Sequence, residues 1–460
     1  MNRSVHWRTR TAAAAVAALS LGVLAACSSS SSSSSPAASS SAPGASSAAA
    51  TASNSAASAT STSACGTNPG VAATGTPINI GAINTKQPGT DFSDIENMTG
   101  AYFACVNANG GINGHPIKYF PVTEQTSPPQ IASLAKQLVT SDHVVGIMGN
   151  SSIIECSVDA AYWKSVGIDV LGAGIDPECY STPNTASVNM GPRYSSDGAV
   201  QYVMAQGASK IAFDQSNVPG TTYIADGPNA LAKAKGVPIQ DFTENVPITS
   251  ANAIATKLVT AAGPSGAVVL NFTPPEALLI LQAAQKLNLE DRVKYWACST
   301  PCNTDFLATS LGSKWNDKLF VNSELLPLDG NTSQTALLFD AILKQYGSSV
   351  SGGVGSFSEM GFTIGEIATH ALESVKGGYT IASVSAALEG VSNFNTGMLC
   401  QGYTYGNYAE HIPNNMDYTV TPDNGKMVQA SAGGGCTLIS ADDPQIAAYR
   451  AVAGTAPMVG

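Results

Sequence analysis

The stretch that most constrains this fold runs over residues 77–122, which read as a strand, a helix and a second strand. The apolar run PINIGAIN, residues 77–84, predicts the first strand. Side chains at residues 101–105 recur with helical spacing, and the helix ends at an Asn-Gly-Gly triplet, residues 109–111, whose glycines supply positive φ angles. The second strand follows at residues 117–122. Such a unit is typical of proteins that alternate strands with helices.

The turn of this unit reads NANGGINGHPI at residues 107–117. It resembles the INAxGGIxGxxI turn of type I periplasmic binding proteins, in the Leu/Ile/Val-binding branch of ABC-transporter solute receptors. An ordinary βαβ unit of another α/β protein is the alternative. The resemblance extends roughly over residues 77–420, and it implies an α/β fold with two doubly wound parallel-sheet lobes joined by a hinge.

Later segments continue the alternation of strands and helices. Asn150-Ser151-Ser152 is expected to open a helix in which Ile154, Val158 and Ala161 face inward. Further strands are expected at residues 143–149, 168–173, 210–213, 266–272, 293–297 and 319–325, with strand-like pieces at 402–405 and 418–420. Further helices are expected at residues 128–139, 199–206, 228–234, 253–262, 275–287, 335–346, 357–375 and 381–388.

The order of these elements predicts two discontinuous lobes. Lobe I is expected to comprise residues 77–190 and 326–394. Lobe II is expected to comprise residues 191–325 and 395–460. A strand that crosses between the lobes near residue 321 accounts for the chain's return to the first lobe.

The N-terminus predicts an export signal rather than part of the fold. Arg3, Arg8 and Arg10 precede a short apolar run at residues 11–23, and Leu-Ala-Ala-Cys follows, ending at Cys27. This ending resembles a bacterial lipobox, so residues 1–27 are a lipoprotein signal peptide and Cys27 is the lipidated residue. A transmembrane anchor is the alternative, although the run is shorter than the ~20 residues that a span needs.

Residues 28–76 are expected to form a disordered tether rich in Ser, Ala and Thr. The leader carries three of the 21 basic residues and no acid, which leaves 18 basic against 32 acidic residues and a net charge of −14. This balance disfavours nucleic acid as a partner, because nucleic-acid binding depends on Lys and Arg neutralising phosphates. No segment after residue 76 has the length and apolarity of a membrane span.

Eight cysteines besides Cys27 indicate disulfides in an exported chain. Their connectivity is open at this stage, and pairing of neighbours is the prediction. Metal is the competing use, but no histidine stands beside a cysteine pair with zinc-finger spacing, so no metal site is predicted. The expected pairs are Cys65–Cys105, Cys156–Cys179, Cys298–Cys302 and Cys400–Cys436, with a redox role as the alternative for the third.

Ligands of open α/β sheets lie beyond the carboxyl ends of the strands. Ser151 and Ser152 place two hydroxyls and free N–H groups at a helix start, which suits a carboxylate. Helix capping is the alternative, but relatives in the resembled family bind the ligand's carboxylate through a serine at this turn. The strand ends are residues 84–92, 150–152 and 174–176 in lobe I and 214–219, 271–273 and 298–300 in lobe II, and Thr273 is a candidate contact.

The resemblance implies further contacts to the amino group of an amino-acid ligand, and this chain departs from them. Gly174 retains the carbonyl, whereas Ile175 replaces the threonine unless Asp176 takes its role. Ser299 stands where lobe II of relatives has an acid. These departures argue against an α-amino acid as the ligand.

Two other positions belong to the same comparison. Phe92 retains the aromatic side chain of the first loop, and Val218 stands in the place of the usual tyrosine. The sequence has no nucleophile elbow, no Walker loop and no dinucleotide fingerprint. We therefore expect no catalytic residue and no cofactor.

Together these features predict an extracytoplasmic receptor, anchored by lipid to the outer face of the cell membrane. It is expected to be a monomer that closes two lobes around a small polar organic ligand, namely an amino-acid-like compound, an amide or a carboxylate, and to deliver it to an ABC permease. A sensor that signals to a membrane receptor and an exported α/β hydrolase are the alternatives.

Overall fold

The computed structural model describes residues 65–455 and Met458. The predicted signal peptide, Cys27 and residues 28–64 lie outside the described residues. The last part of the predicted tether is packed against the first lobe, since Cys65 is disulfide-bonded to Cys105. Backbone N–H groups of Asn68 and Gly75 also donate to the carbonyls of Asn109 and Gly114, both at 2.9 Å. The folded body therefore begins before the expected boundary at residue 76.

The first sheet has five parallel strands in the order β3-β1-β4-β5-β6. The second of these strands along the chain, β3, therefore lies at the edge beside the first, β1. The strands β1, β4 and β5 are apolar and almost wholly buried, as a parallel sheet covered by helices requires, whereas the edge strand β3 is only partly buried. A short β2 pairs antiparallel with the end of β1. The bounds are β1 Ile78–Gln87, β2 Thr90–Asp91, β3 Ile117–Glu124, β4 Gly146–Asn150, β5 Val170–Gly172 and β6 Thr185–Ser187.

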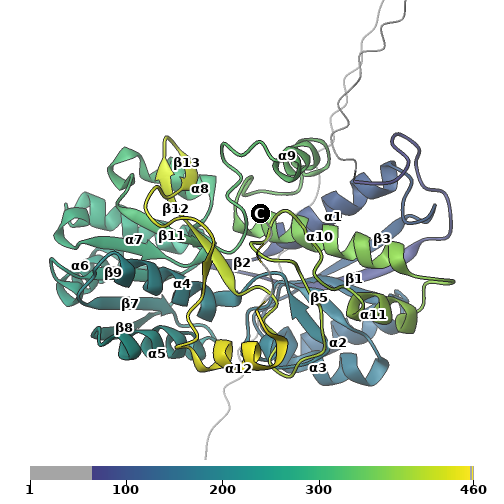
Figure 1. Ribbon diagram of the computed structural model, residues 1–460, viewed down its shortest axis with the longest axis horizontal. Coiled ribbons are helices and arrows are strands. Elements are labelled where there is room, and N and C mark those ends of the chain that lie inside the picture. The colour runs from purple at the N-terminus through teal and green to yellow at the C-terminus, as the bar shows by residue number, and fades with distance from the viewer. Residues whose placement is uncertain (1–64, 456–457, 459–460) are drawn as a thin grey trace, which may run out of the picture. The chain divides into compact units, whose positions relative to one another are not determined.

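Helices cover both faces of this sheet. Helices α1 (Ser93–Ala108) and α10 (Ser356–Ser374) pack together on one face, although they are far apart in the sequence. Figure 1 shows α10 in green beside α1 in purple. Helices α2 (Pro128–Thr140) and α3 (Glu155–Val166) cover the other face, where Ile83 and Trp163 belong to one core.

The second sheet repeats the strand order of the first, as β8-β7-β9-β10-β11. These five strands are parallel, and β12, β13 and β14 extend the sheet antiparallel beyond β11. The repeated order confirms the predicted fold of two doubly wound lobes. The bounds are β7 Ile211–Ser216, β8 Ile239–Glu244, β9 Ala267–Asn271, β10 Tyr295–Cys298, β11 Leu319–Ser323, β12 Met416–Asp423, β13 Lys426–Gln429 and β14 Thr437–Leu438.

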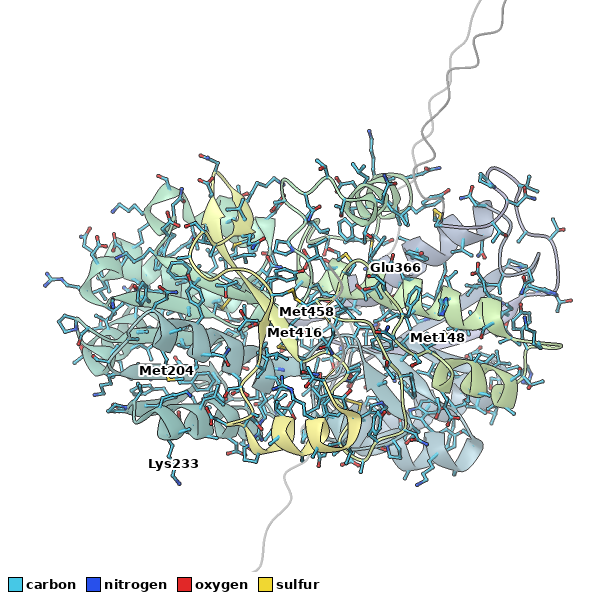
Figure 2. The ribbon with its side chains drawn as sticks, viewed as in Figure 1. Met148, Met204, Lys233, Glu366, Met416 and Met458 are labelled. Carbon is cyan, nitrogen blue, oxygen red and sulfur yellow. A yellow bond between two sulfur atoms is a disulfide. The ribbon has the colours of Figure 1, made fainter. Side chains whose placement is uncertain are left out.

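Helices also cover both faces of the second sheet. One core joins the sheet to α6 (Ala251–Ala262), α7 (Pro274–Lys286) and α8 (Asp305–Leu311). Another core joins it to α4 (Gly191–Ala205), and α5 (Asp226–Lys235) packs against α4. Figure 2 shows Lys233 of α5 pointing away from the body. Among the described helices, none combines the length and apolarity needed to cross a membrane.

The chain passes between the two sheets three times. It enters the second lobe after β6, returns after β11, and reaches β12 after α9 (Gln334–Tyr346), α10 and α11 (Ile381–Glu389). The last passage comes later than the expected boundary at residue 394, because Met398, Tyr403 and Tyr405 are buried in the core of the first lobe. Helix α12 (Pro444–Ala453) then packs Ile446 and Tyr449 against a separate small core.

Some local predictions were wrong. Residues 402–405 form no strand, and Tyr403 makes only an isolated bridge with Phe394. The strand β8 and the helices α8 and α12 were not predicted. Helix α3 begins at Glu155 and buries Glu155, Cys156, Asp159, Ala160 and Trp163, so its inner face is not the expected one. The polar Glu155 is buried there because it accepts a hydrogen bond from the Trp163 indole N–H.

The four disulfides connect the predicted pairs. They join Cys65 to Cys105, Cys156 to Cys179, Cys298 to Cys302 and Cys400 to Cys436. The second ties the start of α3 to the loop after β5. The fourth ties the segment around Met398 to the loop between β13 and β14. Disulfides therefore hold both the first-lobe loops and the last passage between the sheets.

The contact between α1 and α10 depends on the absence of a side chain at Gly361. The Thr99 hydroxyl donates to the Gly361 carbonyl at 3.0 Å, and a Cβ at Gly361 would overlap the Ile95 carbonyl oxygen. We expect Gly361→Ala to lower the free energy of unfolding by about 1–3 kcal/mol, because the two helices must move apart. Chemical denaturation measures this loss.

Gly378 provides the matched control, because a Cβ there meets no atom within 4 Å. Gly378→Ala should change the free energy of unfolding by less than about 0.5 kcal/mol. Equal effects of the two substitutions would contradict the close approach of α1 and α10.

Candidate ligand-binding cleft

A cavity of about 80 Å³ lies where the carboxyl ends of the two sheets face each other. In the first lobe, four of the five parallel strands contribute residues just beyond their ends. Phe92 follows β1 and β2, Ile153 follows β4, Ile175 follows β5 and Asn189 follows β6. The edge strand β3 contributes nothing to the wall.

The second lobe contributes in the same way. Val218 follows β7, Asn271 ends β9, Pro301 follows β10 and Glu324 follows β11, and all four line the cavity. The edge strand β8 again contributes nothing. In both sheets the strand order reverses beside the first strand, β1 or β7, and such a reversal opens a crevice at the carboxyl ends of the strands there.

Four of the nine residues predicted for the site line the cavity. Phe92, Ile175, Val218 and Thr273 come from loops after four different strands. Phe92 packs edge to face against Phe357 of α10, with ring centroids 5.4 Å apart. Phe92 is 8 % exposed and Val218 is 8 % exposed, so both are held in place by their surroundings. Their role in binding remains a prediction that this placement supports.

Ser151 and Ser152 lie behind the cavity wall, and both are buried. The Ser152 hydroxyl donates to Glu124 Oε1 at 2.8 Å and accepts from the Glu155 N–H at 3.1 Å. It therefore binds the first N–H of α3 and links this helix to β3, which leaves it no free donor for a ligand. The hydroxyl of Ser151 is buried without a hydrogen-bond partner in the described structure. The alternative of helix capping thus describes Ser152 better than a ligand contact.

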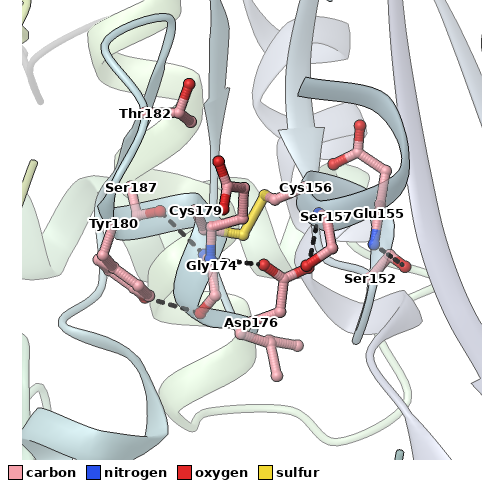
Figure 3. Close-up of a disulfide and its surroundings, with 12 residues drawn as sticks. Ser152, Glu155, Cys156, Ser157, Gly174, Asp176, Cys179, Tyr180, Thr182 and Ser187 are labelled. Atoms are coloured by element: carbon pink, nitrogen blue, oxygen red, sulfur yellow. Dashed lines mark hydrogen bonds between the residues drawn. A yellow bond between two sulfur atoms is a disulfide. The ribbon is translucent and has the colours of Figure 1, made fainter. Parts of the chain in front are cut away.

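Gly174 and Asp176 belong to a loop whose polar groups bond within the protein. The Gly174 carbonyl accepts from the Tyr180 hydroxyl at 2.7 Å and from Asn189 Nδ2 at 2.9 Å. The Asp176 carboxylate accepts from the N–H groups of Ser157 (3.0 Å) and Glu178 (2.8 Å). Figure 3 shows the bond between Tyr180 and Gly174 and the bond between Ser157 and Asp176, beside the Cys156–Cys179 disulfide. Neither group lines the cavity, so both position Ile175 rather than face a ligand.

Burial raises the pKa of Asp176 to about 6, although hydrogen bonds from Ser157 and Glu178 oppose the rise.

Asp176 and the two sulfurs of the Cys156–Cys179 disulfide lie within 4.8 Å of one another. The sulfurs are bonded to each other, so neither is a thiolate that can hold a metal.

Ser299 is fully buried and does not line the cavity. Its hydroxyl has no hydrogen-bond partner among the described residues. The neighbouring Pro301 takes its place on the wall. A shift of two residues in the loop after β10 therefore separates the predicted contact from the observed wall.

Other wall residues were not predicted. Glu324 directly follows β11, the strand after which the chain returns to the first lobe. The carboxyl end of this strand was not among the strand ends considered as ligand positions, so Glu324 was not predicted. Phe357 and Met360 lie in the first turns of α10 and carry no strand-end signal. Their place on the wall results from the packing of α10 against α1.

Burial raises the pKa of Glu324 to about 8, against the lowering effect of its hydrogen bond with Met190. The backbone N–H of Met190, which precedes α4, donates to Glu324 Oε2 at 2.8 Å. The side chain is 2 % exposed. Glu324 is therefore mainly protonated and uncharged near pH 7.

Among the hydrogen bonds that connect the lobes near the cavity, two involve side-chain hydroxyls at its edges. The Thr273 hydroxyl donates to the Gly89 carbonyl at 3.1 Å, in the turn between β1 and β2. The Tyr223 hydroxyl donates to the Ile175 carbonyl. Each bond joins a strand-end loop of one lobe to the other lobe, so opening of the cleft breaks both.

A second cavity of about 620 Å³ lies outside the first. Thr90, Thr273 and Phe357 line both cavities and thus form their common boundary. The outer cavity is lined by four acids, Asp91, Asp94, Glu276 and Asp305. It forms an acidic mouth to a mainly apolar inner cavity.

Two facing α/β lobes with a cavity between their strand ends define a two-lobed ligand-binding protein. The model of a family described as periplasmic binding protein matches residues 77–426. The chain therefore belongs to the periplasmic binding protein family, which comprises binding proteins and not enzymes. None of the curated protein sequences matches it.

Solved structures confirm the type I fold. A branched-chain amino acid ABC transporter protein from Thermus thermophilus with bound valine has a TM-score of 0.69 at 14% identity, over 80% of this chain and 98% of that one. A fatty acid ABC transporter substrate-binding protein from Thermomonospora curvata has a TM-score of 0.67 at 16% identity, over 84% and 97%. An R. palustris solute-binding protein in complex with 4-hydroxybenzoate has a TM-score of 0.63 at 15% identity, over 80% and 98%.

Proposed function

We propose that this protein is the extracytoplasmic receptor of an ABC importer and that its lobes close around a small organic ligand. The observation that carries the proposal is the cavity between the two sheets, whose wall comes from strand ends of both lobes. A ligand held there contacts both lobes only when they approach each other, so its binding free energy favours the closed arrangement. The closed receptor then delivers the ligand to a membrane permease.

The similar structures support the kind of ligand. The Thermus thermophilus protein binds valine and the R. palustris protein binds 4-hydroxybenzoate, and both are small organic compounds. Within the described residues the two lobes are joined by hydrogen bonds at Thr273 and Tyr223 that can form only when the cleft is narrow. A monomer with one cleft suffices for this mechanism.

The proposal includes a lipid anchor at Cys27, carried by the lipobox-like sequence before it. Cys27→Ala should release the protein from the membrane fraction without changing its ligand affinity, because every wall residue of the cavity lies after residue 89. Cell fractionation and calorimetry on the released protein check the two parts separately. Membrane retention of the variant would contradict lipidation.

Phe357 offers a direct test of the cleft. Its ring lies at the boundary of both cavities and packs against Phe92. Phe357→Ala should weaken binding about 10- to 100-fold, because roughly 1.5–3 kcal/mol of ring burial against the ligand is lost. Native mass spectrometry of the purified protein identifies a co-purified compound, and calorimetry with that compound measures the loss.

Phe306 is the matched control. It is 45 % exposed and lines only the outer cavity. Phe306→Ala should therefore leave the affinity within about twofold of the wild type, since a ring that stays in water adds little to binding. An equal loss in both variants would place the ligand outside the inner cavity.

A further inference from the structure

The inner cavity is mainly apolar. Three phenylalanines, Phe92, Phe272 and Phe357, line it together with Ile175 and Val218. The first-lobe and second-lobe walls both contribute, so an enclosed ligand meets apolar surface on two sides. Such a wall favours a ligand whose surface is mostly carbon, because each buried apolar group adds to affinity.

The wall offers no counter-charge to an ionic group. Among the described residues, its lining includes no Lys, Arg or His, and Glu324 is the only acid. Glu324 is buried and mainly uncharged near pH 7. A carboxylate in this cavity would thus lose its water without gaining an opposite charge, which is costly. An ammonium group would gain one only if Glu324 lost its proton, which its burial opposes.

The nearest cation along the chain does not serve the cavity. Arg193 follows the wall residue Pro192, but its Nε lies 2.7 Å from Asp443 Oδ2, and its side chain is 9 % exposed. The N-terminus of α4 could bind an anion, but the Met190 N–H that precedes it already donates a hydrogen bond to the Glu324 carboxyl. An anionic ligand would have to displace this carboxyl.

Polar wall groups are mostly bonded to the protein itself. Asn189 donates to the Gly174 carbonyl and accepts from the Tyr180 hydroxyl at 3.1 Å. Asn271 Nδ2 lies 3.0 Å from the Pro192 carbonyl and 2.7 Å from Ser196 Oγ. The Thr221 hydroxyl donates to the Val218 carbonyl at 2.7 Å. Few hydrogen bonds remain for the ligand, which fits one small polar substituent rather than several.

The volume limits the ligand's size. One water needs on the order of 10–15 Å³ of such space, so about 80 Å³ admits roughly six water-sized groups. This is the size of one six-membered ring. Of the four acids of the mouth, Asp91 and Asp305 are paired with Lys86 and Lys426, which leaves Asp94 and Glu276 to disfavour the approach of anions.

We propose that the cleft binds an uncharged ring compound with a single neutral polar substituent, such as an amide or an alcohol, in preference to the carboxylate, amine or amino acid of similar size. This inference rests on the proposed receptor function and names its ligand class. Of the ligand types expected from the sequence, it retains the amide and sets aside the amino acid and the carboxylate.

The test uses one skeleton in three charge states, with the mature chain as the sample. Benzamide, benzoate and benzylamine are titrated at about pH 7 by calorimetry, with valine as the zwitterion. Benzamide should bind at least tenfold more tightly than each charged compound. Tighter or equal binding of benzoate, benzylamine or valine overturns the proposal, and so does the absence of benzamide binding.

A variant supplies a second readout that does not depend on the native ligand. Val218→Lys adds a cation to the wall and should reverse the preference between benzamide and benzoate by at least tenfold. An unchanged preference in the folded variant overturns the assignment of this wall. A carboxylate or amino acid that co-purifies with the wild type also overturns the ligand class, yet it leaves the receptor function standing. An unchanged affinity of the Phe357→Ala variant would instead contradict the proposed receptor cleft itself.

Discussion

Raising the pH from about 5 to about 8 is expected to lower the free energy of unfolding by several kcal/mol. Burial raises the pKa of Glu96, Glu155 and Glu324 from 4.5 to about 8 in the folded protein. Between these values the folded chain holds protons that the unfolded chain has lost. Stability is therefore fully present below about pH 4.5 and is lost as the pH rises toward 8, by up to roughly 5 kcal/mol for each fully buried glutamate.

Glu155 allows the effect to be assigned to one group. It is 1 % exposed and accepts from the Trp163 indole, while Asp159 and Asp176 add repulsion that raises its pKa further. Glu155→Gln mimics the protonated acid at every pH. Near pH 5 the variant should be about as stable as the wild type, and near pH 8 it should be more stable by about 2–4 kcal/mol.

Urea unfolding at three pH values measures both effects. Glu178→Gln is the control, because Glu178 lies beside the Cys156–Cys179 disulfide, as Glu155 does, but is exposed rather than buried. It should leave the pH dependence unchanged. A free energy of unfolding that rises between pH 5 and 8, or a Glu155→Gln curve parallel to the wild type, would contradict the buried neutral glutamates.

Loss of the Cys400–Cys436 disulfide is expected to be the most damaging covalent change within the later part of the chain. The bond closes a loop with a sequence separation of 36, which corresponds to about 4 kcal/mol in the chain-entropy model. For a body of this length, that loss lowers the apparent unfolding midpoint by roughly 5 °C. Replacing both cysteines with serine and following thermal unfolding under non-reducing conditions measures it.

The Cys298–Cys302 pair supplies the comparison, because its sequence separation is only 4. The same model gives about 2 kcal/mol for this bond, so the double serine variant should lose about half as much. Equal midpoint shifts in the two double variants would show that loop length does not determine the loss.

Much of the fold follows from apolar periodicity in the sequence. The run GAVVLNF predicted a buried strand at residues 266–272, and β9 covers Ala267–Asn271. The run at residues 253–262 likewise matches α6, Ala251–Ala262. Strand β8 was not predicted, because it is an edge strand whose residues are only half-buried or exposed and its apolar pattern is weak. Helix α12 depends on contacts of Ile446 and Tyr449 with distant tyrosines, which no local pattern reveals.

The site was predictable in its region and less so in its residues. The strand-end rule located the cavity wall, and it identified Phe92, Ile175, Val218 and Thr273. Ser152 does not line the cavity, since its hydroxyl is held by Glu124 of β3, so a ligand contact at Ser152 stays a prediction. Which strand-end side chain faces the cavity depends on such bonds between elements, and these are not visible in a single sequence.

The pairing of α1 with α10 bears on the order in which the protein folds. Thr99 and Gly361, which meet in this contact, are separated by 262 positions. The parallel strands of the second sheet, by contrast, form one continuous stretch from Ile211 to Ser323. Because closing a long loop costs entropy before its contacts form, these five parallel strands can assemble before α1 contacts α10, whereas β12–β14 join the second sheet only later in the chain. A newly made chain therefore becomes able to bind only after α10 has packed on the first lobe and β12 has paired with β11.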